Sequence, residues 1–172
     1  MTVQAIIALG SNIPPREAAL RAAIESMGRL EHTEVIRCSR LYETEPVGGP
    51  PQGVYFNAAA LIETSLTPGE LLDSLLRIEK KQGRHRTVQN GPRTIDLDII
   101  FYGESIIDEP SLVIPHARFA ERGFVLQPLA DIIPRFIDPR SKGKVSDLLE
   151  AWIRSGGEPV EGREFHGPPC VD

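Results

Sequence analysis

Two aspartates, Asp96 and Asp98, stand one residue apart within an apolar, β-prone run over residues 95–102. Side chains alternate between the faces of a strand, so these two would share one face, with Cα atoms about 7 Å apart. The intervening apolar side chains would then point to the core: Ile95, Leu97, Ile99 and Phe101. Two neighbouring carboxylates repel each other and favour a cation between them, and Mg²⁺ that carries phosphate oxygens suits such an open oxygen site. Alone, this pair is a weak signal, because solvated strand faces often carry two ordinary aspartates.

Arginines flank the pair and strengthen the metal interpretation. Arg93 lies in Gly91-Pro92-Arg93-Thr94 directly before the strand, and Arg84 and Arg86 stand at the other end of the same loop. The planar guanidinium matches phosphate through bidentate hydrogen bonds. Carboxylates and arginines around one strand end are typical of phosphoryl transfer. The sequence has neither a Walker A loop nor a kinase glycine-rich loop, so a nucleotide would bind in another geometry.

The charge distribution also indicates a specific anion. The chain has 172 residues and a net charge of -5, which argues against a general nucleic-acid binder. Six Lys or Arg residues nevertheless fall between positions 77 and 93, offset by Glu79. A basic helix end favoured by the helix dipole explains Lys80 and Lys81 but not the arginines beyond them.

Two further groups could bind a flat heterocycle and its phosphate partner. Tyr55 and Asn57 would share one strand face, with Tyr55 stacking on a ring and Asn57 reading its edge. His116 and Arg122 could contact phosphate, and Phe124 could supply a second stacking surface. Each group alone is more often an ordinary structural feature.

The order of elements predicts an α+β fold of the ferredoxin-like type, βαββαβ, with an antiparallel four-stranded sheet, helices on one face and C-terminal helical additions. The strands are expected over residues 3–9, 33–42, 55–63 and 95–102. One helix should start near Pro14, with Ser11 or Asn12 as its N-cap. A second should start at Thr67, with a capping box to Glu70, and stop at Gly83. Residues 1–156 are expected to form one domain and 157–172 a flexible tail rich in Gly and Pro.

Compartment and partners follow from composition. No apolar run is long enough to cross a bilayer, and the N-terminus shows no secretory pattern, so we expect a cytoplasmic enzyme without membrane or nucleic-acid partners. Cys38 and Cys170 lie far apart in the sequence, outside any zinc-ligand spacing, and are expected to be free thiols.

Together these stretches resemble the 6-hydroxymethyl-7,8-dihydropterin pyrophosphokinases of folate biosynthesis. The matching pieces appear in the family's order: Ala8-Leu9-Gly10-Ser11-Asn12, Tyr55-Phe56-Asn57-Ala58-Ala59, Glu79 with Gly83-Arg84, Gly91 to Asp98, Pro115-His116, and Arg122-Gly123-Phe124 with Pro128-Leu129. One departure is Asn90, which stands where members often carry Trp.

The resemblance implies attack of the pterin hydroxymethyl oxygen on the β-phosphorus of ATP, with release of AMP. It implies ATP as co-substrate and two Mg²⁺ ions held by Asp96 and Asp98, and we expect the protein to be a monomer. The implied catalytic residues are Arg84, Arg93, Asp96 and Asp98. The implied ATP-binding residues are Glu79, Arg84, Arg93, Ile99, His116 and Arg122. The implied pterin-binding residues are Thr44, Val47, Tyr55, Asn57, Asp96 and Phe124. The loops over residues 43–54 and 83–91 would close over the substrates as lids.

Two other functions fit parts of the pattern. A nucleotidyltransferase could use the same aspartate pair, and it would release pyrophosphate instead of AMP. A ferredoxin-like ligand sensor would need no metal pair, and it leaves the clustering of arginines around the aspartates unexplained.

Overall fold

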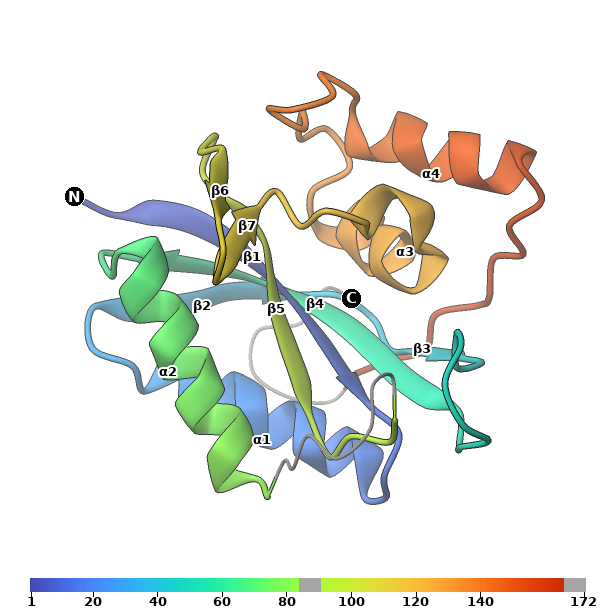
Figure 1. Cartoon of the computed structure of the whole chain (residues 1–172), viewed down its shortest axis with the longest axis horizontal. Helices are drawn as coiled ribbons and strands as arrows, with labels where there is room; N and C mark the ends of the chain where they lie inside the picture. The colour runs from blue at the N-terminus through green and yellow to red at the C-terminus, as the bar shows by residue number, and fades with distance from the viewer. Residues whose placement is uncertain (84–90, 166–172) are drawn as a thin grey trace.

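The computed structural model describes residues 1–83 and 91–165 (Figure 1). The strands are β1 (Val3–Ser11), β2 (Thr33–Cys38), β3 (Tyr42–Thr44), β4 (Tyr55–Thr64), β5 (Asp96–Tyr102), β6 (Ile107–Glu109) and β7 (Leu112–Ile114). The helices are α1 (Arg16–Gly28), α2 (Pro68–Lys81), α3 (Gly123–Ile132) and α4 (Val145–Arg154), with the short 3₁₀ helix η1 (Phe119–Glu121) before α3. The described part of the chain holds no helix with the length and apolar character that a membrane crossing requires.

The main sheet runs in the order β2-β4-β1-β5, and every neighbouring pair is antiparallel. This order is that of the predicted βαββαβ core. The strand expected over residues 33–42 is divided, because the chain leaves the ladder between β2 and β3. There, the backbone N–H of Arg40 donates to the Asp131 carboxylate at 3.1 Å instead of to β4. Strand β3 then resumes pairing with β4, which makes the sheet five-stranded.

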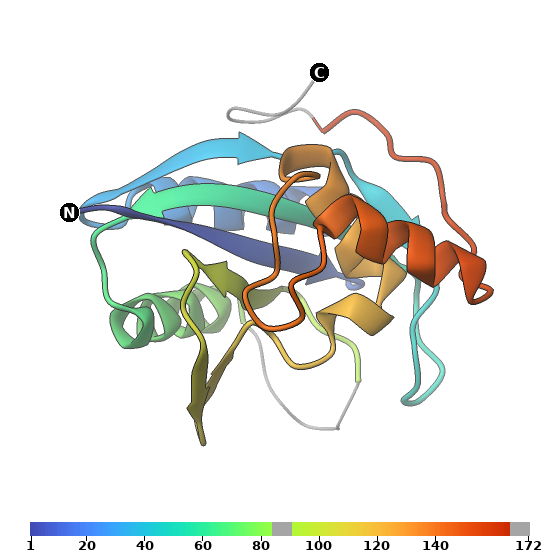
Figure 2. The ribbon, with the colours of Figure 1, turned by 90° about the horizontal axis from the view of Figure 1, so that it is seen from above.

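Both faces of the sheet are covered (Figure 2). Helices α1 and α2 pack on one face, where Leu20, Ile24 and Leu75 are buried against the strands. The C-terminal additions α3 and α4 pack on the other face, over Ile6, Leu61 and the end of β5. The prediction of helices on one face therefore holds for the βαββαβ core alone. The second helical layer is the one that faces the predicted site.

The side chain of Phe101 does not lie on the same face of β5 as that of Ile99. The prediction that both point to the core on one face is therefore wrong for Phe101. Ile7 pairs with Ile99 but Ile6 pairs with Phe101, so Ile100 is an extra residue on β5. Such a bulge reverses the alternation beyond it. The Phe101 ring consequently packs under α3, with its centroid 5.0 Å from the ring centroid of Phe119.

The two predicted helix starts had different outcomes. The capping box of α2 is present: Thr67 Oγ1 accepts from the Glu70 N–H at 3.2 Å, and Glu70 Oε2 accepts from the Thr67 N–H at 2.8 Å. Helix α1 begins at Arg16, with Pro15 as its N-cap and no side-chain cap. Neither Ser11 nor Asn12 serves as its cap, because the helix begins only at Arg16.

Residues 157–165, here called the C-terminal strap, pack against the fold, in contrast to the flexible tail expected from their composition. The strap leaves α4 and passes the edge of the sheet beside β3 (Figures 1 and 2). Its last residue, Phe165, is 3% exposed and joins the core beneath α1 and α2. Residues 166–172, including Cys170, lie outside the described part of the chain. Cys38 is buried in the core.

Candidate active site

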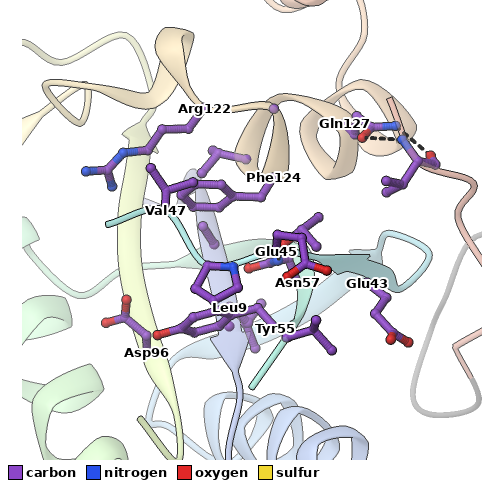
Figure 3. A pocket seen from close by; sticks show the side chains of 18 of the residues that line it. Leu9, Glu43, Glu45, Val47, Tyr55, Asn57, Asp96, Arg122, Phe124 and Gln127 are labelled. Carbon is purple, nitrogen blue, oxygen red and sulfur yellow. Dashed lines mark hydrogen bonds between the residues drawn. The ribbon is translucent and has the colours of Figure 1, made fainter. Parts of the chain in front are cut away.

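One cavity of about 780 Å³ lies between the sheet and α3 (Figure 3). It gathers residues from β1, β3, β4, β5, the loop after β3 and the start of α3. The predicted site residues that line it are Thr44, Val47, Tyr55, Asn57, Arg93, Asp96, Asp98, Arg122 and Phe124. The cavity therefore brings the aromatic group and the charged group together.

The aromatic end is formed by β4, β3 and α3. Tyr55 and Asn57 lie on the cavity face of β4, while Phe56 between them is 5% exposed on the opposite face. Asn57 is buried and donates from Nδ2 to Thr44 Oγ1 at 2.6 Å, which fixes its amide. Phe124 approaches from α3, on the side of the cavity opposite Tyr55 (Figure 3). A flat ring fits between two such aromatic surfaces.

The charged end is formed by β5 and the segment before it. Asp96 and Asp98 are half-buried, pair with Gly10 and Ala8 of β1, and both face the cavity. Arg93 Nη1 lies 3.0 Å from Asp96 Oδ2. The alternation read from the sequence places both carboxylates correctly because the bulge in β5 lies beyond them.

Arg122 and His116 approach from the segment before α3. The Arg122 guanidinium lies 5.7 Å from the centre of the Phe124 ring, so a cationic and an aromatic side chain adjoin at the start of α3. His116 is outside the cavity lining, and its Nδ1 accepts from the Arg118 N–H at 3.4 Å. Burial, followed by the Arg122 charge, lowers the pKa of His116 below its usual 6.5, although Asp96 opposes this shift. A neutral ring with this contact carries its proton on Nε2.

Two further predicted nucleotide residues, Glu79 and Ile99, are outside the cavity lining. Glu79 is 3% exposed, outside the cavity lining, and accepts from the Leu97 N–H at 3.2 Å, between the two aspartates. Ile99 is buried in the core beneath the sheet. Arg84 lies outside the described residues, as does most of the loop expected to close over the nucleotide.

Asn12 has a role that the sequence did not reveal. Its Oδ1 accepts from the Arg93 N–H at 2.8 Å, and its Nδ2 donates to Gln52 Oε1 at 2.7 Å and to the Gly53 carbonyl at 3.1 Å. Its own N–H donates to the Arg93 carbonyl at 3.2 Å. Asn12 thus joins the segment before β5 to the loop before β4. Its position after a strand suggested a helix cap. Its role in joining the two segments becomes visible only when both are placed side by side in the fold.

Other lining residues were also missed: Glu43, Glu45, Arg118, Glu121, Gln127, Trp152, Glu158, Pro159 and Val160. Trp152 shows why they were missed. A Cβ at Gly123 would lie 2.2 Å from the Trp152 ring, so the glycine of Arg122-Gly123-Phe124 makes room for a side chain from α4. The single Trp in the sequence was the available signal, but nothing local linked it to Gly123.

The carboxylate pair suits one kind of metal site. In the described ranges, no group of three or more His, Cys, Asp or Glu side chains could enclose a metal ion. Two aspartates that line a cavity instead fit Mg²⁺, which keeps waters and takes further ligands from substrate phosphates. The donor set therefore fits a metal that arrives with a nucleotide.

Comparison with known proteins identifies a family. Residues 6–134 match the family described as 7,8-dihydro-6-hydroxymethylpterin-pyrophosphokinase (HPPK). Two similar proteins are named 2-amino-4-hydroxy-6-hydroxymethyldihydropteridine pyrophosphokinase. The one from Synechocystis is 44% identical over 146 residues, covering 85% of this chain and 74% of its own. The one from Pseudomonas aeruginosa is 39% identical over 162 residues, covering 94% and 99%.

Solved structures show the same fold. The HPPK-DHPS of Plasmodium falciparum, solved with pterin and p-hydroxybenzoate, superposes with a TM-score of 0.73 at 16% identity. The match covers 90% of this chain but 42% of that one, so this chain spans less than half the length of the solved protein. The family match and the relatives together show that this chain belongs to the 7,8-dihydro-6-hydroxymethylpterin-pyrophosphokinase family.

Proposed function

We propose that this chain transfers pyrophosphate from ATP to the hydroxymethyl group of 6-hydroxymethyl-7,8-dihydropterin, releasing AMP, in folate biosynthesis. The observation that carries the proposal is a cavity that joins Tyr55, Asn57 and Phe124 to Arg93 and the aspartate pair. An acceptor ring and a polyphosphate held in one such cavity would meet at the boundary between its two ends. The names of the relatives support the same substrate.

At the aromatic end, the pterin would stack between Tyr55 and Phe124. Asn57 and Thr44 are linked at 2.6 Å, so their polar atoms are fixed where the edge of the pterin would be read. Val47 is 73% exposed in the loop over the cavity and would cover the ring once it is bound. In this placement the hydroxymethyl group would be directed toward Asp96.

At the charged end, Asp96 and Asp98 would hold two Mg²⁺ ions. These ions would neutralise the phosphate charge and polarise the reacting oxygens. Arg93 lies 3.0 Å from Asp96, within reach of phosphates bound at the same place. Arg122 and the Nε2–H of His116 would contact the phosphates from the side of α3, and Arg84 would do so from the loop over residues 84–90.

The proposed step balances as a displacement at phosphorus. The hydroxymethyl oxygen forms a bond to the β-phosphorus, and the bond from that phosphorus to the α–β bridging oxygen breaks. The hydroxyl proton passes to solvent water, and AMP leaves with the bridging oxygen. Ile99 and Glu79 would lie by the nucleotide. Glu79 would also stabilise β5, because its carboxylate accepts a hydrogen bond from the Leu97 N–H.

We also propose that residues 1–156 contain the catalytic domain, that the protein is a monomer and that it acts in the cytoplasm. The loops over residues 43–54 and 83–91 would close over the substrates as lids. Sedimentation and hydrogen exchange, with and without an ATP analogue and pterin, test the oligomeric state and the closure.

Nucleotide analysis tests the proposed reaction. The protein is incubated with ATP, Mg²⁺ and the hydroxymethyl dihydropterin, and the nucleotides are separated. AMP should form only when the pterin is present, and EDTA should stop its formation until excess Mg²⁺ is added. ADP would indicate an ordinary kinase, and free pyrophosphate would indicate a nucleotidyltransferase; either outcome would refute the proposal.

A further inference from the structure

We propose that Gln127 is a positioning residue for the pterin end of the site, acting through the C-terminal strap. This inference rests on the proposed function and concerns how the same cavity is shaped. It starts from the strap residues Glu158, Pro159 and Val160, which line the cavity together with the proposed pterin residues.

Gln127 holds the middle of the strap by two hydrogen bonds. Its Nε2 donates to the Val160 carbonyl at 2.8 Å, and its Oε1 accepts from the Val160 N–H at 3.1 Å (Figure 3). A side-chain amide that pairs with both backbone groups of one residue fixes the direction of that backbone. Gln127 follows Phe124 by three positions on α3, so the two side chains lie on neighbouring parts of one helix face. The residue that would stack on the pterin and the residue that holds the strap therefore share a rigid element.

Glycines hold the start of the strap close to α4. The Gly157 N–H donates to the Trp152 carbonyl at 3.0 Å, and a Cβ at Gly157 would lie 2.3 Å from the Trp152 ring. Gly123, at the start of α3, contacts the same ring. The strap and α3 are thus packed on a common indole beside the cavity.

The far end of the strap reaches the strands that carry the other pterin residues. Arg163 and Leu41 exchange two backbone hydrogen bonds of 2.9 Å, and Leu41 directly precedes β3. The Arg163 guanidinium lies 4.4 Å from the centre of the Phe56 ring. Phe56 lies between Tyr55 and Asn57 on β4. Contacts therefore run from Phe124 through Gln127 and the strap to the strands on the opposite side of the pterin end.

The strap could instead serve stability alone by covering the β3 edge of the sheet. The two roles predict different measurements. Stability alone would affect the pterin and ATP sites alike, whereas Gln127, which holds the strap, lies on the side of the cavity away from Asp96 (Figure 3). The positioning role therefore predicts a loss of pterin affinity with little change in ATP affinity.

Binding measurements on Gln127→Met test this. Methionine keeps the length of the side chain and removes both hydrogen bonds. The probes are 6-hydroxymethylpterin and a non-hydrolysable ATP analogue with Mg²⁺, each titrated against the full chain by calorimetry. The dissociation constant for the pterin should rise about tenfold, because the strap would no longer be held in place beside the pterin. That for the ATP analogue should change less than about twofold, and hydrogen exchange at the Val160 and Arg163 amides should accelerate.

Two pairs of variants complete the test. Gln82→Met is the control for Gln127→Met, because Gln82 also donates from a side-chain amide to a backbone carbonyl, that of Ala19 at 3.2 Å, but lies outside the cavity lining. Arg163→Ala should weaken pterin binding, whereas Arg154→Ala, at an exposed arginine of α4, should not. Unchanged pterin affinity in Gln127→Met, or equal losses for both ligands, would overturn the inference. If the unaltered chain binds no pterin, the proposed function fails instead.

Discussion

Asp96 and Asp98 differ in their surroundings although they share a strand face. Arg93 lies 3.0 Å from Asp96, and the charge of Asp96 also acts on His116. A bound metal ion and its phosphates would therefore reorganise charges around Asp96. Asp98 is chosen for substitution, because a change at Asp96 would also alter its ion pair with Arg93.

Asp98→Asn should lower kcat by at least about 100-fold, because the amide keeps the size of the side chain but loses the charge that would hold Mg²⁺. Steady-state kinetics at saturating Mg²⁺ measures this. Asp108→Asn is the control, since Asp108 is an aspartate on β6 outside the cavity lining, and it pairs with Arg140 at 2.9 Å. Full activity in Asp98→Asn would rule out a metal role for this residue.

His116 should make the fold sensitive to acid. Burial and the charges of Arg122 and Arg118 lower its pKa in the folded protein, and Asp96 opposes them. Between the lowered value and 6.5, the unfolded chain binds more protons than the folded one. The free energy of unfolding should therefore fall as the pH drops below about 6.5, with no contribution from this residue above that pH.

Urea unfolding at several pH values from 7.5 to 5 tests this assignment in the unaltered chain and in His116→Gln. The difference in stability between the two proteins should shift in favour of His116→Gln as the pH falls. A difference that stays constant across this range would show that His116 does not titrate abnormally.

Among the elements, α3 connects the two ends of the site. Its start carries Arg122 and Phe124, and Gly123 between them lies against the Trp152 ring of α4. Helix α4 thereby packs directly against the residue that precedes the stacking residue Phe124. A side chain at position 123 would push against an indole that also packs on Gly157.

Gly123→Ala should destabilise the protein by about 1–3 kcal/mol, because its Cβ would lie 2.2 Å from atoms of the Trp152 ring. Gly69→Ala on α2 is the control: nothing lies within 4 Å of its Cβ, and alanine should stabilise that helix by about 0.5–1 kcal/mol. Urea denaturation gives both values. Equal stability changes in the two variants would contradict the packing described for Trp152.

For the protein as a whole, the local patterns predicted the features that depend on neighbours in sequence. Alternation placed Asp96 and Asp98 on one face, and the Thr67–Glu70 capping box set the start of α2. The order of elements predicted the sheet order, because antiparallel βαββαβ chains have few compact arrangements.

Features that depend on distant residues could not be predicted in this way. The extra residue in β5 turns Phe101 toward α3, and only the register with β1 reveals it. Asn12 resembles a helix cap until the loops it joins are in place. The glycines of the strap suggested disorder, but Gly157 and Gly162 lie against the rings of Trp152 and Tyr42. A glycine chosen for close packing and a glycine in a flexible tail are identical in sequence.

The mass of the pterin product tests the central claim most directly. The purified protein is given ATP, Mg²⁺ and 6-hydroxymethyl-7,8-dihydropterin, and the pterin fraction is examined by mass spectrometry. The account predicts that the pterin gains two phosphate groups in a single step, with no singly phosphorylated product at any time. A pterin carrying one phosphate, or one carrying an adenylyl group, would contradict it.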